Sequence, residues 1–204
     1  MRPDLLTLVS FLTTRVQNPT DDDENKLFKG VRYLSHTRNL SMCLGIIGDV
    51  KITAYIDASF AIHADMRSHT GVTMGKGSLY SKSSKQKLNT MSSIESELMA
   101  ISDALPQFLW FQRFLSAQGY PEFPAHIWED NESTITLAKT GRSCSERSRH
   151  IEIRYFWIHD YLKNGTITIG HLGTDEMAAE MFTKPLQGAK FLKFRQLCLS
   201  DNDV

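Results

Sequence analysis

The order in which strand-like and helix-like segments follow one another constrains this 204-residue chain most. Side chains alternate between apolar and polar over the first strand-like segment, which is the pattern of a half-buried strand. The expected strands are 51–60, 69–74, 78–83, 125–130 and 166–172. Three successive strands, followed by two strands that alternate with helices, predict an α/β fold with a mixed five-stranded sheet and helices on both faces.

Helical spacing of apolar residues and end signals place the helices. The expected helices are 3–17, 25–35, 92–105, 108–115, 134–139, 151–163, 175–182 and 189–199. Pro106 is expected to kink or split the long helix that Ser92 or Ser93 caps. The acidic run 21–24 indicates a solvated loop or a helix N-terminus. Five aromatic residues at helical spacing are most simply core residues: Trp110, Phe111, Phe114, Phe156 and Trp157.

Length and composition limit the class of protein. The chain has room for one domain of about 130 to 150 residues and an appendage, whereas two full domains would be cramped. Lys plus Arg and Asp plus Glu both number 23, so only local patches can attract nucleic acid. Thr7 and Ser10 interrupt the early apolar stretch, which fits neither a signal peptide nor a membrane span, and no membrane partner is expected.

Four acids lie where an expected element approaches its end or a turn: Asp57, Glu97, Asp130 and Glu180. A single acid is most simply a solvated surface group. However, Asp57 is surrounded by strand residues, and Glu97 lies at the edge of an apolar helical stripe. Hydrolysis of a phosphodiester by two divalent ions needs several converging carboxylates, because hard cations such as Mg²⁺ prefer oxygen ligands. These acids are therefore candidate ligands of a two-metal site.

Several segments together resemble the ribonuclease H of copia-type LTR retrotransposons. They are YIDAS (55–59), DMRSHTG (65–71), SKSSKQ (81–86), SSIESELMA (92–100), EDNES (129–133), RHIEIRYF (149–156) and FTKPL (182–186). The resemblance implies a ribonuclease H-like fold for 49–186 and a C-terminal helix and tail for 187–204. The first part of the chain is similar to the end of the preceding reverse transcriptase. It implies that 1–48 is a remnant of that enzyme's C-terminal, thumb- or connection-like helices.

The resemblance also implies an activity: endonucleolytic hydrolysis of the RNA strand of RNA–DNA hybrids, with two Mg²⁺ ions, or Mn²⁺ in their place. Asp57, Glu97 (rather than Glu95), Asp130 and Glu180 correspond to the metal ligands. The family usually has Asp at the fourth position, so Glu180, with one more methylene, is expected to reduce activity. Asp175 and Glu176 remain alternatives to Glu180.

The resemblance implies that His171 aids proton transfer or product release, although a lone histidine at a strand end can be structural. Candidate contacts to nucleic acid are Ser83, Lys85, Asn89, Thr90, Asn131 and Arg149. Other basic residues with the same possible role are Lys82, Lys87, Arg142, Arg147 and Arg154, for which solvated surface is the competing interpretation. The implied partners are an RNA–DNA hybrid and the reverse transcriptase portion of the same polyprotein, in cytoplasmic virus-like particles.

Two other functions remain open. One is a catalytically weakened or inactive retroelement-derived domain that still binds nucleic acid. The other is an integrase- or transposase-type enzyme, since Asp57, Asp130 and Glu180 also have the Asp-Asp-Glu order of that class. Glu97 discriminates between the classes, because an acid in the helix after the third strand is required by ribonuclease H and not by the integrase branch.

Overall fold

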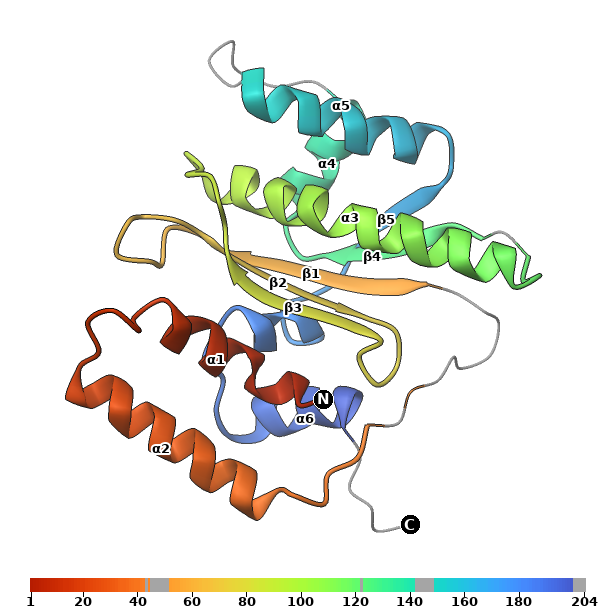
Figure 1. Cartoon of the computed structure of the whole chain (residues 1–204). Helices are drawn as coiled ribbons and strands as arrows, with labels where there is room; N and C mark the ends of the chain where they lie inside the picture. The colour runs from red at the N-terminus through yellow and green to blue at the C-terminus, as the bar shows by residue number, and fades with distance from the viewer. Residues whose placement is uncertain (43, 45–51, 122, 142–148, 200–204) are drawn as a thin grey trace.

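One mixed sheet organises the molecule (Figure 1). The computed structural model describes residues 1–42, 44, 52–121, 123–141 and 149–199, without the side chains of 149–152. The strands are β1 (Thr53–Ser59), β2 (His69–Met74), β3 (Tyr80–Lys85), β4 (Ala125–Glu129) and β5 (Ile167–His171). They lie in the order β3-β2-β1-β4-β5, so the expected mixed five-stranded sheet is confirmed.

The strand directions bring the ends of four strands to one edge of the sheet. β2 is antiparallel to β1 and β3, whereas β4 is parallel to β1 and β5 is parallel to β4. β1, β3, β4 and β5 therefore all end at the edge where β2 begins. At this edge Ser59 pairs with His69, His69 pairs with Lys85, and Glu129 pairs with His171.

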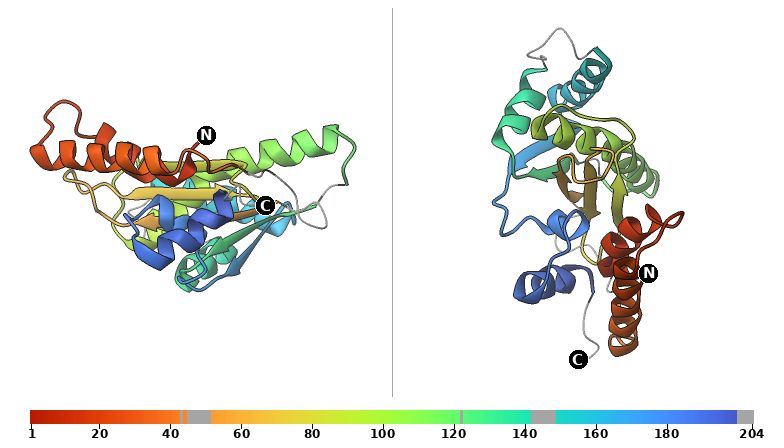
Figure 2. Two further views of the ribbon diagram at one scale, coloured as in Figure 1. Left: turned by 90° about the horizontal axis from the view of Figure 1, so that it is seen from below. Right: turned by 90° about the vertical axis from the view of Figure 1, so that its left-hand side faces the viewer.

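Helices cover both faces of the sheet (Figures 1 and 2). The helical elements are η1 (Pro3–Leu5), α1 (Leu6–Thr13), α2 (Asp21–His36), α3 (Ser93–Ala117), α4 (Glu132–Thr140), α5 (Arg149–Lys163), η2 (Ala178–Phe182) and α6 (Gly188–Cys198). α3, α4 and α5 lie on one face, while α1, η2 and α6 lie on the other. Within the described residues, no helix is long and apolar enough to cross a bilayer.

The helix α3 continues through Pro106, so the expectation of a split was wrong. Proline removes one hydrogen bond of the helix and crowds the preceding turn, at a cost of about 3 kcal/mol. Residues on both sides of it are nevertheless completely buried against the core, among them Leu105 and Phe108. Tertiary packing of both halves therefore holds the chain in one helix.

The outer side of α3 carries aromatic residues that we expected in the core. Trp110 is 60% exposed and Phe114 is 44% exposed, and their rings stack with centroids 5.6 Å apart. Phe156 on α5 is exposed as well, whereas Phe111 and Trp157 pack against the core as expected. A helix turns by about 100° per residue, which places 110 and 114 opposite the stripe that contacts the sheet.

The start of α2 lies four residues earlier than expected. Thr20 forms a capping box with Asp23, since the threonine side chain accepts a hydrogen bond from the Asp23 backbone and the Asp23 carboxylate accepts one from the Thr20 backbone. The acidic run therefore forms the first turn of the helix, where carboxylates are favoured by the helix dipole.

The N-terminal helices and α6 complete the second face of the sheet. A second core combines residues of η2 and α6 with Leu6, Leu40 and Met42 from the N-terminal part. The Thr7 hydroxyl of α1 donates a hydrogen bond of 2.6 Å to the Met181 carbonyl of η2. The division into a reverse transcriptase remnant (1–48), a ribonuclease H-like domain (49–186) and a C-terminal helix and tail (187–204) stays a prediction.

Candidate metal centre

Asp57 and Asp130 are neighbours on adjacent parallel strands. Tyr55 pairs with Trp128 in the β1–β4 ladder, and two residues further along each strand come Asp57 and Asp130. Side chains alternate along strands, so residues aligned in this way point to the same face. Asp57 is 3% exposed near the end of β1, and Asp130 directly follows β4.

Glu97 reaches the same place from the N-terminal part of α3. Ser92 caps this helix by accepting a hydrogen bond from the Glu95 backbone, and Glu97 follows on the buried side with 5% exposure. One carboxylate oxygen from each of Asp57, Glu97 and Asp130 lies within 4.8 Å of the other two. Three of the four acids predicted from the sequence therefore converge at the edge where the strands end.

This group fits a divalent cation by the chemistry of its donors. All three candidate ligands are carboxylates, and their hard oxygen atoms are ligands that Mg²⁺ and Mn²⁺ prefer. Glu97 Oε2 is buried without a hydrogen-bond partner in the described part of the chain. A buried anionic oxygen that lacks a donor costs free energy, and a bound cation would remove that cost.

Thr183 fixes the orientation of Asp57, because its hydroxyl donates a hydrogen bond to Asp57 Oδ2. The 3-10 helix η2 can lie this close to the sheet because Gly71, the cross-strand partner of Asp57, has no side chain. A Cβ at that position would lie 2.6 Å from the Ala179 carbonyl oxygen and 2.7 Å from Thr183 Cγ2. Gly71 is thus required by close packing at the site.

Glu180 lies beside this group but outside the three oxygens that converge. Its Oε1 accepts a hydrogen bond of 3.0 Å from Lys184 Nζ, and its Oε2 lies 2.5 Å from Lys190 Nζ. Burial raises the pKa of Glu180, but hydrogen bonds from Lys190 and Lys184 outweigh this, so its pKa lies below the ordinary value. Its role as a fourth metal ligand stays a prediction. The alternatives Asp175 and Glu176 are both exposed.

Glu129 is a completely buried acid of the site that our sequence analysis missed. Its Oε1 accepts a hydrogen bond of 3.2 Å from the Asn131 backbone, and its Oε2 has no partner among the described residues. Burial and the neighbouring acids raise the pKa values of Glu97 and Glu129 well above the ordinary value, and burial also raises that of Asp57. The alternation of Ala125, Ile127 and Glu129 toward the core was the signal that could have found it.

We expect Glu129→Gln to stabilise the metal-free protein at neutral pH. When folding raises the pKa of a carboxyl group, the protonated group stabilises the native state at pH values below the pKa that it has in the unfolded chain. This stabilisation is lost as the pH rises through the pKa that the group has in the folded protein. Glutamine keeps the shape and removes the charge. In EDTA, the melting temperature at pH 7.5 should rise by about 3–6 °C relative to the parent protein, and the difference should shrink toward pH 4.5.

Thermal melts followed by circular dichroism across this pH range measure the effect. Glu132→Gln is the matched control, since Glu132 is exposed in the first turn of α4. If both substitutions change the melting temperature equally, or if the gain from Glu129→Gln does not depend on pH, the buried charge of Glu129 is not the cause of the effect.

His171 ends β5 at the same edge of the sheet and is exposed. It pairs with Glu129 in the β4–β5 ladder, so it lies one strand away from the acids. In the loop after β5, the Thr174 hydroxyl donates a hydrogen bond of 3.1 Å to Asp130 Oδ2. The position is compatible with a role next to the candidate metal centre, and the role itself stays a prediction.

The candidate nucleic-acid contacts on β3 and after it differ in accessibility. Ser83 Oγ hydrogen-bonds to His69 Nε2 at 2.8 Å, and Lys85 Nζ pairs with Asp65 at 2.8 Å. Thr90 is 8% exposed and hydrogen-bonds to Ser68. By contrast, Asn89 is exposed between β3 and α3. Of the four, Asn89 is best placed for a substrate and Thr90 is the least accessible.

The other candidate contacts lie beyond β4. The Asn131 side chain caps α4 by accepting hydrogen bonds from the backbones of Ser133 and Thr134. Arg149 begins α5, but its side chain lies outside the described residues, as do Arg142 and Arg147. Arg154 instead pairs with Asp103 on α3 at 2.6 Å, which ties the two helices together.

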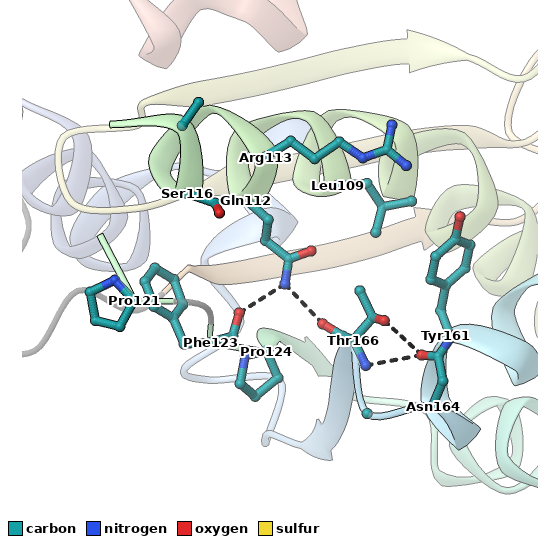
Figure 3. Close-up of a pocket in the computed structure, with 12 residues that line it drawn as sticks. Leu109, Gln112, Arg113, Ser116, Pro121, Phe123, Pro124, Tyr161, Asn164 and Thr166 are labelled. Carbon is teal, nitrogen blue, oxygen red and sulfur yellow. Dashed lines mark hydrogen bonds between the residues drawn. The ribbon is translucent and has the colours of Figure 1, made fainter. Parts of the chain in front are cut away.

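A pocket at the other end of α3 is separate from the acids (Figure 3). Gln112 Nε2 donates hydrogen bonds of 2.9 Å to the carbonyls of Phe123 and Thr166 and joins the helix to the loop before β4 and to the turn before β5. Among its described lining residues there is no acid. We therefore place the candidate catalytic centre at the edge where the strands end.

The chain has a ribonuclease H-like fold. A solved ribonuclease H1 isolated from compost, LC11-RNase H1, has the same fold, with a TM-score of 0.50 and 15% sequence identity over 65% of this chain and 91% of that chain. No protein-family model matches the chain.

Sequence comparison identifies the relatives. The chain is 29% identical over 199 residues to the retrovirus-related Pol polyprotein from transposon TNT 1-94 of Nicotiana tabacum, covering 96% of this chain and 15% of that polyprotein. It is 30% identical over 112 residues to secreted RxLR effector protein 161 of Plasmopara viticola, covering 53% of this chain and 79% of that protein. The chain is a homologue of the Pol polyproteins of copia-type retrotransposons, and it spans a small part of their length.

Proposed function

We propose that this chain is a retrotransposon-type ribonuclease H that cleaves the RNA strand of RNA–DNA hybrids endonucleolytically. The observation that carries the proposal is the convergence of carboxylate oxygens of Asp57, Glu97 and Asp130 within 4.8 Å at one edge of a ribonuclease H-like sheet. The homology to retrotransposon Pol polyproteins supports the choice of substrate.

Asp57, Glu97 and Asp130, with Glu180 beside them, would hold two Mg²⁺ ions, or Mn²⁺ in their place. When bound, these ions would supply an activated water and would stabilise negative charge on the departing 3′ oxygen, and the product would carry a 5′ phosphate. The chain contributes orientation, since Thr183 holds Asp57 Oδ2 in place. It also contributes a buried setting in which the negative charge of Asp57 and Glu97 is poorly solvated and strongly attracts cations.

Labelled RNA–DNA hybrid, duplex DNA and single-stranded RNA, each incubated with the chain and Mg²⁺, Mn²⁺ or EDTA, test the proposal. We expect cleavage of the RNA strand of the hybrid alone, and none in EDTA. Metal-dependent cutting of duplex DNA would favour the integrase- or transposase-type alternative. Hybrid binding without any cleavage would favour a domain that has lost turnover.

The ion pairs of Glu180 support a second candidate function, a weakened nuclease. Its longer arm is held by Lys184 and Lys190 rather than directed at the other acids. A displacement of about 1 Å in a reacting group can cost on the order of 10²-fold in rate. Activity that is reduced but metal-dependent is the expected consequence.

Glu180→Asp is therefore expected to increase kcat for hybrid cleavage in Mg²⁺ by about tenfold, because the shorter side chain keeps the charge and shortens the arm. Steady-state kinetics with a labelled hybrid measure the change. Asp160→Asn serves as the control, because Asp160 is exposed on α5 and is not among the candidate metal ligands. If Glu180→Asp lowers kcat or leaves it unchanged, Glu180 is not a misplaced fourth ligand.

The reverse transcriptase portion of the same polyprotein is the partner we propose for the N-terminal helices. The homology supports this, because the Pol relatives extend far beyond the matched region. Action inside cytoplasmic virus-like particles belongs to the same proposal.

A further inference from the structure

Two ammonium groups bind the carboxylate of Glu180. This acid belongs to η2 and is only 6% exposed. Lys184 Nζ lies 3.0 Å from its Oε1, and Lys190 Nζ of α6 lies 2.5 Å from its Oε2. The second lysine reaches it because η2 and α6 contact each other on one face of the sheet (Figure 1). Cations of the chain itself therefore neutralise both oxygens of this acid.

Lys184 also lies near two of the acids that converge. It directly follows Thr183, whose hydroxyl donates a hydrogen bond to Asp57 Oδ2. Its own backbone N–H donates a hydrogen bond of 3.0 Å to the Glu180 carbonyl, which fixes the chain at this point. Burial lowers the pKa of Lys184, but the negative charges of Asp57, Glu180 and Asp130 raise it by more, so its pKa lies above the ordinary value. The Lys184 ammonium group is therefore a charged neighbour of the candidate metal centre.

Lys190 has different surroundings. Besides Glu180, its acidic neighbour is Asp175, whose carboxylate lies 3.5 Å from Lys190 Nζ. The Asp175 side chain is almost fully exposed and is not one of the converging acids. Of the two lysines, Lys184 is thus the one that acts on Glu180 and on the converging acids together.

A second divalent ion would need Glu180 as a further ligand. The converging oxygens of Asp57, Glu97 and Asp130 can hold one ion by themselves. Glu180 becomes available only when an ammonium group leaves it, and a divalent ion that enters beside Lys184 also meets a like charge. The ion pair is therefore expected to oppose loading of the second position.

We propose that Lys184 competes with the second divalent ion for Glu180, so that the two ions bind in sequence and the second binds more weakly. The inference rests on the proposed two-ion nuclease, and it adds the residue that sets the affinity of the second position. Lys184 is a positioning residue in this scheme, because it acts through Glu180 and not on the substrate.

Titration of the full chain with Mn²⁺, with free Mn²⁺ followed by electron paramagnetic resonance, counts the bound ions and gives both dissociation constants. Lys184→Met should tighten binding of the second ion by about tenfold, because methionine keeps a long apolar side chain and removes the charge. The Lys184 side chain is 42% exposed, so solvent screening keeps the effect from being larger. Binding of the first ion should tighten less, because Glu180 is not among its ligands.

Three matched variants separate competition for Glu180 from other roles of a lysine. Lys184→Arg keeps the charge, so the second ion should bind as weakly as in the parent chain. Lys193→Met removes a charge from α6 and should change neither dissociation constant, since Lys193 Nζ donates its hydrogen bond to the Asp175 carbonyl. Lys190→Met should tighten the second ion less than Lys184→Met does, because Lys190 is not a neighbour of the converging acids.

Equal affinity for the second ion in the parent and in Lys184→Met overturns the proposal, and so does equal tightening by Lys190→Met or Lys193→Met. A parent chain that binds both ions equally tightly also overturns it. If that parent still cleaves the hybrid, the nuclease proposal stands, whereas a parent that binds no Mn²⁺ and leaves the hybrid intact defeats both. Circular dichroism in EDTA verifies that each variant is folded, and Lys184→Gln repeats the test with a polar side chain.

Discussion

Asp57→Asn should reduce hybrid cleavage by at least about 10³-fold and leave the metal-free fold as stable as before, or more stable. Asparagine keeps the shape and an oxygen that can accept the hydrogen bond from Thr183, but it removes one of the three charges that converge. Burial raises the pKa of Asp57, which means that its ionised form is disfavoured in the folded protein. Removal of this charge should therefore raise the melting temperature in EDTA at neutral pH.

Two measurements separate catalysis from folding in this variant. Hybrid cleavage in Mg²⁺ reports the first, and thermal melts with and without Mn²⁺ report the second. Mn²⁺ should stabilise the parent chain and not the Asp57→Asn variant. Asp160→Asn, at an exposed position on α5, is the control that should behave like the parent. If Asp57→Asn retains more than about a tenth of the activity, the three acids do not form the catalytic metal site.

Asp4→Ala should destabilise the chain by about 2–4 kcal/mol, the largest effect that we expect outside the metal centre. The Asp4 side chain is completely buried. It accepts two hydrogen bonds from Arg2, at 3.0 and 2.7 Å, and one of 2.7 Å from the Tyr33 hydroxyl of α2. Removal of the carboxylate leaves the Tyr33 hydroxyl without this acceptor and removes two hydrogen bonds of Arg2. Arg2 still donates to the carbonyl and hydroxyl of Thr37 and is partly exposed, which moderates the loss.

Urea unfolding followed by circular dichroism measures this loss. Asp22→Ala is the control, since the Asp22–Lys26 pair is exposed and such pairs contribute about 0.5 kcal/mol or less. We expect a single unfolding transition in both variants, because α1, η2 and α6 share one core. If Asp4→Ala loses no more stability than Asp22→Ala, the buried network does not hold the N-terminal helices to the rest of the molecule.

The sequence alone determined the kind and order of the elements. Period-two alternation placed the first strand, and short segments bounded by turn residues placed the other four within a few residues. Spacing of three to four residues placed the helices. It also singled out Asp57, Glu97, Asp130 and Glu180 as acids near the ends of elements or at turns. The local pattern indicated a partly buried setting for Asp57 and Glu97, where an acid without a function is costly. The resemblance to copia-type ribonuclease H indicated that Glu97, rather than Glu95, is the candidate metal ligand on the helix.

Tertiary structure decided whatever depends on residues far apart in the chain. Glu180 could be identified as an acid near the end of the chain, but its partners Lys184 and Lys190 depend on how η2 and α6 pack. Pro106 stays within one helix because residues on both sides of it pack against the core. Trp110 stays in solvent because it lies on the side of α3 that faces away from the sheet. A local pattern records which side of an element is apolar; only the packed molecule determines which sides are covered, since burial arises from long-range contacts.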